Sequence, residues 1–254
     1  MAEKLKFGFY WAASCGGCEI AVLDTNAALL DIVARADIVF WPVAMDVKYD
    51  DVRAMPDGFM DVCFFNGSVR NSEQEELAHL LRQKAKVLVA FGSCAHHGCI
   101  PGLANLSRRE QILEGIYRRE PSVANPEGTL PQTNASVTEG QLTLPEFYDM
   151  VRPLDRVVPV DYYLPGCPPP VPLILDAVEA VFTGTLPTKG AVLAPTKALC
   201  EECTRNTHKP KKMPDVKRPW EVQADPEVCF LDQGIVCMGP ATRGGCGQRC
   251  INGN

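Results

Sequence analysis

The residues best suited to chemistry in this chain are its twelve cysteines, because four of them stand where apolar runs end. The run that begins at Leu5 leads into a Cys-x-x-Cys turn, Cys15 to Cys18, and two later runs end at Cys94 and Cys167. The carboxyl ends of parallel strands share one edge of an open sheet, where such sheets bind their ligands. We therefore predict that these four thiols converge. Four thiolates at one place suit an iron-sulfur cubane or a structural zinc ion.

The spacing of these cysteines favours iron-sulfur chemistry over zinc. Zinc ribbons take paired ligands from short knuckles, whereas these ligands come from three strand ends spread over more than half of the chain. A redox cluster gains from burial in such a scaffold, because hydrogen bonding and exclusion of water tune its potential. A zinc-stapled scaffold protein without redox activity is the alternative from another functional class.

Other reactive side chains near these turns have competing interpretations. Cys99 could replace Cys94 as a ligand or only line the site, and Cys94 is favoured because it ends the strand. His96 and His97 could ligate or carry protons, although histidines beside a cluster more often donate a hydrogen bond to sulfur. Cys63 lies inside a predicted strand, which favours the role of a small buried apolar side chain.

The Cys-x-x-Cys turn also opens a predicted helix. Apolar residues recur close to a 3.6-residue period over residues 20–34, so Cys18 stands at a helix N-terminus. The positive end of the helix dipole favours thiolate over thiol there, which predicts a lowered cysteine pKa. Glu19 follows, and we interpret it as an ordinary acid of the first helical turn rather than a proton relay.

Strands and helices alternate along most of the chain. Residues 120–155 are rich in Pro, Asn, Thr and Gly and predict a polar surface excursion. The strand, helix, strand alternation elsewhere predicts a parallel, doubly wound α/β sheet. The predicted strands are 5–11, 36–43, 62–69, 87–94 and 157–167, and the predicted helices are 20–34, 72–85, 146–151 and 173–182.

The composition changes at residue 190, which predicts two domains, 1–189 and 190–254. The second has few aliphatic residues, so we expect its folding to be coupled to metal binding. The basic run Lys209 to Lys212 is interpreted as a solvated linker, with docking onto an acidic partner as the lesser alternative. The cysteines of the second domain are Cys200, Cys203, Cys229, Cys237, Cys246 and Cys250.

Charge and hydropathy exclude several functional classes. A net charge of -6 argues against a nucleic-acid binder, which would show a clustered basic face. No run approaches the about 20 apolar residues that span a bilayer. Because no apolar signal segment opens the chain, we expect a reducing, cytoplasmic compartment in which such cysteines bind metal. The sequence has no glycine fingerprint of a dinucleotide-binding site and no convincing hydride acceptor. We therefore expect one-electron transfer rather than hydride transfer.

Three motifs together resemble those of the small subunits of nickel-iron hydrogenases, particularly the cytoplasmic multisubunit type related to methyl-viologen-reducing and deazaflavin-reducing enzymes. They are Cys15-Gly-Gly-Cys18-Glu, Gly92-Ser-Cys94 leading into Gly98-Cys-Ile-Pro-Gly102, and Leu164-Pro-Gly-Cys167-Pro-Pro. The stretch 233–247 is similar to the ferredoxin-like cluster domain of that family. The resemblance covers nearly the whole chain.

The resemblance implies a flavodoxin-like domain followed by a small ferredoxin-like iron-sulfur domain. It also implies a proximal [4Fe-4S] cluster on Cys15, Cys18, Cys94 and Cys167, with one or two further clusters on the six later cysteines. In that family a separate nickel-iron large subunit activates H2. The small subunit then passes electrons to a downstream flavin or iron-sulfur subunit, and it supplies no catalytic residue of its own.

Three departures from the family pattern qualify this expectation. Two cubanes need eight cysteines where six are present. We expect the chain to stop short of a further Cys-x-x-Cys pair, with non-cysteine ligands or an incomplete cluster as the alternative. Cys99 stands where relatives often have glycine, and Asn66 where many have an acid. The cluster-bearing subunit of quinone oxidoreductases, which shares the scaffold, is the near alternative. That subunit has adjacent cysteines in its first motif and lacks a C-terminal cluster domain.

Overall fold

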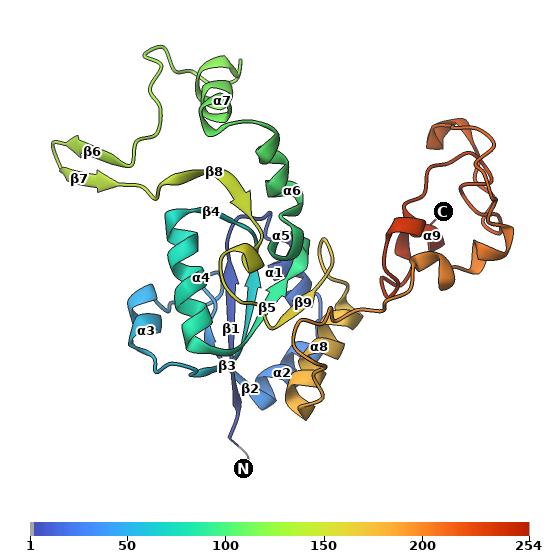
Figure 1. Ribbon diagram of the computed structural model, residues 1–254, viewed down its shortest axis with the longest axis horizontal. Coiled ribbons are helices and arrows are strands. Elements are labelled where there is room, and N and C mark those ends of the chain that lie inside the picture. The colour runs from blue at the N-terminus through green and yellow to red at the C-terminus, as the bar shows by residue number, and fades with distance from the viewer. Residues whose placement is uncertain (1–2, 254) are drawn as a thin grey trace.

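The computed structural model describes residues 3–253 and is built on a five-stranded parallel sheet of order β2-β1-β3-β5-β9 (Figure 1). Every neighbouring pair in this sheet is parallel. Counted along the chain, the order is 2-1-3-4-5, which is that of flavodoxin-like folds. The predicted parallel α/β sheet is therefore confirmed. Its strands are β1 (Leu5–Trp11), β2 (Ala36–Phe40), β3 (Met60–Asn66), β5 (Ala85–Phe91) and β9 (Tyr162–Leu164).

Helices cover both faces of this sheet, as a doubly wound architecture requires (Figure 1). One face packs against α1 (Gly17–Leu23), α2 (Ala28–Arg35) and α8 (Val171–Thr183). The other packs against α3 (Tyr49–Ala54), α4 (Ser72–Lys84) and α5 (Gly92–His97). Because both faces are covered, the central strands read as continuous apolar runs.

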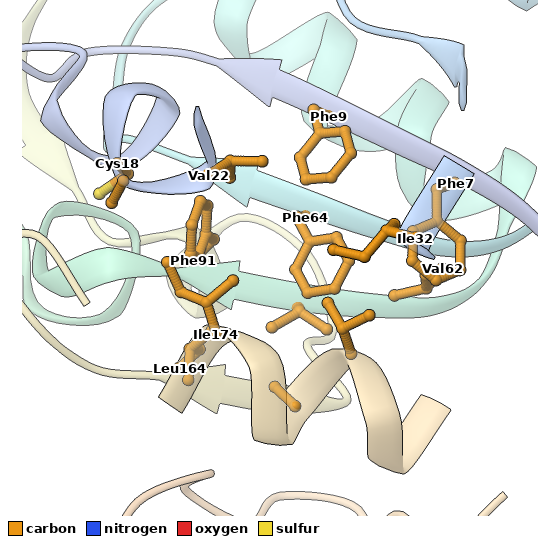
Figure 2. Packing of buried hydrophobic residues seen from close by; sticks show 14 of the residues in the cluster. Phe7, Phe9, Cys18, Val22, Ile32, Val62, Phe64, Phe91, Leu164 and Ile174 are labelled. Carbon is orange, nitrogen blue, oxygen red and sulfur yellow. The ribbon is translucent and has the colours of Figure 1, made fainter. Parts of the chain in front are cut away.

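The core under α1, α2 and α8 is rich in aromatic rings (Figure 2). Phe9 of β1 stacks on Phe64 of β3 with ring centroids 5.2 Å apart, and Phe64 meets Phe91 of β5 edge-on at 5.8 Å. Cys18 lies at the end of this core toward which the strand arrows point (Figure 2). The packed rings therefore support the sheet edge on which the cysteines were predicted to meet.

The predicted helix over 20–34 is interrupted, because α1 ends at Leu23 and α2 begins only at Ala28. Asn26 adopts the left-handed region with a φ of 52°, and the Thr25 hydroxyl donates a hydrogen bond to the carbonyl of Val22. Side-chain bonding to nearby backbone competes with the helical ladder and turns the chain here.

The predicted helix over 146–151 is wrong, since this stretch forms β8 (Phe147–Arg152). It pairs antiparallel with β4 (Val69–Asn71) in a separate two-stranded sheet. Pairing gives the backbone of β4 hydrogen-bond partners that an isolated edge strand would lack. A helix of six residues has no such compensation, because nucleation is costly.

The predicted strand over 157–167 shrinks to the three residues of β9. It is preceded by a 3-10 turn over Leu154–Arg156. Pro159 also precedes it, and this residue has no backbone N–H to donate to a neighbouring strand. The helix predicted at 72–85 is confirmed as α4, and Asn71 caps it by accepting a hydrogen bond from the Gln74 amide at 2.8 Å. The helix predicted at 173–182 is confirmed as α8, with Gly184 as its left-handed C-cap.

Residues 99–143 form an arm that extends from the sheet past α5 (Figure 1). It consists of short helices and a two-stranded hairpin, and its hairpin is largely exposed. None of the helices described within residues 3–253 has the length and apolar content to cross a bilayer. The elements of the arm are α6 (Cys99–Gly102), a 3-10 turn (Leu103–Leu106), α7 (Arg109–Glu114), a π turn (Gly115–Arg119), β6 (Asn134–Val137) and β7 (Gly140–Thr143).

Residues 190–253, which we call the C-terminal lobe, lie beside the sheet and follow α8 through an extended stretch (Figure 1). Within its described residues the lobe has no strand beyond isolated bridges such as Ala198 with Arg243 and Lys217 with Ile235. Its conformation is therefore set mainly by turns. These are 3-10 turns at Leu199–Glu201, Thr204–His208, Pro219–Glu221 and Gly239–Ala241, and α9 (Arg249–Asn252).

Candidate functional site

The Cys-x-x-Cys turn is fixed at the end of β1 by backbone pairing. The Ala12 amide donates to the carbonyl of Asn66 at 2.7 Å, which continues the pairing of β1 with β3 beyond the strand ends. Gly16 then adopts a φ of 78°, and a Cβ on it would lie 2.8 Å from the Trp11 ring. Glycine is therefore required at this position, and it lets the turn pass under Trp11 into α1.

The ends of β5 and β9 are joined by hydrogen bonds. The Ser93 amide donates to the carbonyl of Gly166 at 2.7 Å, and the Gly166 amide donates to the Ser93 hydroxyl at 3.3 Å. A Cβ on Gly92, whose φ is 84°, would lie 2.4 Å from the sulfur of Cys18. The strand ends therefore approach each other only because small residues line the contact.

The four thiols predicted to converge lie along one rim of the sheet. The Cys18 thiol interacts electrostatically with those of Cys94, Cys15 and Cys167, and all four cysteines are free of disulfides. Cys18 and Cys94 are each only 6% exposed, whereas Cys15 and Cys167 face solvent. They are not gathered around a single ion: within residues 3–253, no three His, Cys, Asp or Glu side chains are grouped to hold one.

The pKa values of the Cys18, Cys94 and Cys167 thiols are raised, contrary to the prediction from the helix N-terminus. Burial, followed by the neighbouring thiols, raises the pKa of Cys18 and raises that of Cys94 to about 11. Burial and the Cys99 thiol raise the pKa of Cys167. These effects outweigh the dipole of the seven-residue α1. A bound metal cation would relieve the repulsion among thiolates, so metal binding would release protons from these thiols.

Cys99 adds a fifth thiol at the outer side of the rim. It opens α6 with a φ of 40°, contacts the Cys167 thiol through a hydrogen bond and acts electrostatically on Cys94. The pKa of Cys18, in contrast, is raised by the thiols of Cys94, Cys15 and Cys167. Cys94 is thus a neighbour of the buried Cys18, and Cys99 is a neighbour of Cys94 and Cys167.

A buried polar network behind Cys18 was only partly visible in the sequence. The Glu19 carboxylate accepts hydrogen bonds from the Trp41 indole and the Asn66 amide, and Glu19 is 4% exposed. Burial raises its pKa, and the two hydrogen bonds oppose this shift. Trp41 escaped sequence analysis because it reads as an ordinary core aromatic at the end of a strand.

The two histidines of this loop stack on each other. The His96 and His97 ring centroids are 3.6 Å apart, and His96 also packs on Tyr163 at 4.4 Å. Burial and then His97 lower the pKa of His96 to about 4, so its imidazole is neutral near pH 7. Cys63 is fully buried in β3, as expected of a small apolar side chain.

Four cysteines of the C-terminal lobe line one small cavity of about 20 Å³. Gly239 sits between two of them, because a Cβ on it would lie 3.4 Å from the sulfurs of both Cys200 and Cys237. The Gly239 amide also donates a hydrogen bond to the Cys237 sulfur at 3.4 Å. The structure therefore divides the six cysteines, which sequence spacing alone did not. The four that line the cavity are Cys200, Cys203, Cys229 and Cys237.

Cys246 lines a different cavity, of about 450 Å³, between the lobe and the rim. Cys167 and His97 line it from the sheet, and Arg243 lines it from the lobe. Cys250 is exposed on α9 and lines neither cavity. Apart from Cys63, the cysteines thus fall into three places: the rim, the 246–250 turn and the four-cysteine cavity.

Comparison with known proteins matches both parts of the chain. Residues 15–181 match the family described as the NADH ubiquinone oxidoreductase 20 kDa subunit. The iron-sulfur subunit of the F420-non-reducing hydrogenase of Archaeoglobus profundus is 45% identical over 251 residues, covering 97% of this chain and 78% of the relative. A subunit of the F420-non-reducing hydrogenase of Methanothermobacter marburgensis is 37% identical over 254 residues, covering 98% and 76%.

Solved structures give the same picture of the fold. A chain of an NAD+-reducing [NiFe]-hydrogenase superposes with a TM-score of 0.62 at 29% identity, covering 72% of this chain and 93% of that one. A chain of the [NiFeSe] hydrogenase of Desulfovibrio vulgaris Hildenborough covers 99% of this chain and 88% of its own, with a TM-score of 0.57. At 17% identity, this second likeness concerns the fold alone.

Proposed function

Because the chain belongs to the family of hydrogenase small iron-sulfur subunits, and to the family described as the NADH ubiquinone oxidoreductase 20 kDa subunit, we propose that it relays electrons within a nickel-iron hydrogenase complex. The electrons would come from H2 oxidised in a partner large subunit. They would leave through this chain to a downstream flavin or iron-sulfur subunit. The chain itself would supply ligands and insulation and no catalytic residue.

One observation carries this proposal: thiols from three strand ends share one rim, and a Cβ on Gly92 would collide with one of them. An all-sulfur donor set on a rigid buried edge fits a cubane, which takes up and returns one electron at a time. Cys15, Cys18, Cys94 and Cys167 would hold this proximal cluster. The hydrogen bonds between Ser93 and Gly166 hold two of the ligand loops in register.

The C-terminal lobe would hold one or two further clusters. Cys200, Cys203, Cys229 and Cys237 line one cavity and would supply the four sulfur ligands of one of them. Cys246 and Cys250 would contribute to another site, and Cys246 shares a cavity with the rim. We accordingly assign residues 1–189 to a flavodoxin-like domain and 190–254 to a ferredoxin-like cluster domain. The order of relay would be the rim, the 246–250 turn and the four-cysteine cavity.

The exposed side of the rim suits a covering partner. Cys15 and Cys167 face solvent there, and the apolar side chains of Trp11 and Ile100 beside the ligand loops are exposed as well. A nickel-iron large subunit docked over this rim would bury them and exclude water from the cluster. We place the assembly in the cytoplasm.

Two observations favour the hydrogenase role over a quinone-oxidoreductase role. The cysteines of the first motif are separated by Gly16 and Gly17, and the four-cysteine cavity lies outside the residues that match the 20 kDa subunit family. Either redox role differs from a zinc-stapled scaffold in composition. Metal analysis under argon should find iron with acid-labile sulfide, and zinc without sulfide would refute both redox roles.

Replacing a rim ligand tests the relay directly. Cys18→Ala should abolish H2-dependent dye reduction by the complex, whereas Cys63→Ala, which changes a buried thiol away from the rim, should retain it. The complex should also co-purify with a larger nickel-containing chain. Full dye reduction by the Cys18→Ala complex would refute the role of this residue in the relay.

A further inference from the structure

A basic segment, residues 209–220, stands out against the acidity of the chain. It holds five lysine and arginine side chains and one aspartate, a net charge of +4 within a chain of -6, so the rest of the chain carries -10. All five cations are exposed, and none forms an ion pair within the part of the chain described here. The cations are Lys209, Lys211, Lys212, Lys217 and Arg218.

Both ends of the basic segment are anchored at the four-cysteine cavity. Lys209 lines this cavity together with the cysteines. The Lys217 amide donates to the carbonyl of Gly234 at 2.8 Å, and Lys217 bridges in parallel with Ile235, two residues before Cys237. The segment is therefore a loop held against the cluster ligands rather than a free linker.

Large apolar side chains are exposed along the same loop and the stretch to which it is paired. Trp220 is 80% exposed, Val216 70% and Met238 66%. Arg218 lies over the Trp220 ring at 5.9 Å. Exposed tryptophan, methionine and arginine are enriched in protein interfaces, where they supply most of the binding energy. These side chains add apolar contact area beside the five cations.

We propose that the basic segment is the docking site of an acidic electron-accepting protein surface, which it aligns with the four-cysteine cavity. This inference rests on the proposed relay and names the chemistry of its exit. Unpaired cations beside the ligands would steer a partner of negative potential and suppress approach in other orientations. Trp220 and Val216 would then be buried in the contact. A protein is favoured over nucleic acid because the rest of the chain is acidic and would repel a polyanion longer than the loop.

The test measures binding separately from electron transfer. The complex is titrated with an acidic plant-type [2Fe-2S] ferredoxin as the probe, at low and high salt. Lys211→Glu/Lys212→Glu/Lys217→Glu should weaken binding by about tenfold or more at low salt, and the difference should shrink at high salt. The matched control, Lys4→Glu/Lys48→Glu/Arg156→Glu, makes the same charge change on the sheet region and should bind like the unaltered complex.

H2-dependent reduction of benzyl viologen by the same preparations tests the relay itself, because this small dye needs no docking face. Both triple variants should reduce the dye at the unaltered rate. Failure of the unaltered complex in this assay would refute the relay and leave the binding result to decide the docking site. Zero-length carbodiimide coupling of the complex with bound ferredoxin should join Lys211, Lys212 or Lys217 to carboxylates of the ferredoxin.

Several outcomes would overturn the docking site. Equal ferredoxin binding by the two triple variants would do so, as would coupling confined to lysines of the sheet region. Transfer RNA bound by the unaltered complex and lost in the basic-segment variant, with ferredoxin binding unchanged, would assign the loop to nucleic acid. Self-association removed by that variant in sedimentation, with ferredoxin binding unchanged, would assign it to a second copy of this chain.

Discussion

The two cysteine-rich places in this chain are held in different ways. The rim thiols stand on strand ends above a core of stacked aromatic rings. The four-cysteine cavity is formed by 3-10 turns, and within residues 190–253 the fully buried apolar side chains are Leu199 and Ile251. A sheet that buries its own core can stand without a ligand. We therefore expect a lobe with so little buried apolar surface to depend on bound metal for a fixed conformation.

Iron removal should show this contrast most strongly. In iron-free protein, we expect amides of the C-terminal lobe to exchange with solvent deuterium at nearly unprotected rates. Amides of β1, β3 and β5 should remain slower by about a thousandfold or more, because their core is intact. Hydrogen exchange with mass spectrometry measures both regions in one sample. Equal loss of protection in sheet and lobe would show that the rim also needs its cluster to fold.

A pair of cysteine variants should sharpen the assignment at the rim. Cys94→Ala should lower the iron content by about four atoms per chain, because one cubane loses a ligand. Cys99→Ala should leave the iron content unchanged, since Cys94 acts on the buried Cys18 thiol, whereas Cys99 acts on Cys94 and Cys167. Iron and sulfide analysis with electron paramagnetic resonance separates the two. The opposite result would make Cys99 the ligand.

A smaller change tests the close approach of the strand ends. Gly92→Ala places a methyl group where it would lie 2.4 Å from the Cys18 sulfur, on a backbone with a φ of 84°. We expect a loss of about 1–3 kcal/mol in stability and reduced iron at the rim only. Gly102→Ala is the control, because nothing lies within 4 Å of its added carbon. Iron content and thermal unfolding measure the effect, and normal values for Gly92→Ala would contradict the rim geometry.

The smallest predicted effect concerns acid. Burial would raise the pKa of Asp161, but bonds from Lys189, the Leu88 amide and Arg82 outweigh it and hold the pKa below its ordinary value of 3.8. A lowered folded-state pKa stabilises the sheet above pH 3.8, and this stabilisation is lost as pH falls through the folded-state value.

Asp161→Asn should therefore cost about 1–3 kcal/mol near pH 7 and reduce the dependence of stability on pH below 4. Thermal unfolding followed by circular dichroism measures both effects. Asp176→Asn, at an exposed carboxylate of α8, should change neither. An unchanged acid dependence in Asp161→Asn would mean that other carboxylates control the acid stability of the sheet region.

The sequence was informative where a local pattern has one structural solution. Apolar runs such as the one at Leu5–Trp11 identified the parallel strands, and the turn residues after them identified the rim cysteines. The helix over 146–151 was mispredicted because a six-residue pattern is decided by its partner, here β4. The break at Asn26 was missed because a single left-handed residue leaves the apolar period nearly intact.

By itself, the sequence determined the parallel α/β sheet, the edge at which the rim thiols meet and the change of character at residue 190. These follow from hydrophobic periodicity and from residues adjacent along the chain. Only the tertiary structure decided how the later cysteines divide between cavities, that Cys99 neighbours Cys94, and that Trp41 and Asn66 hold Glu19. Each of these depends on contacts between distant segments, and a one-dimensional pattern carries no information about which turns pack together.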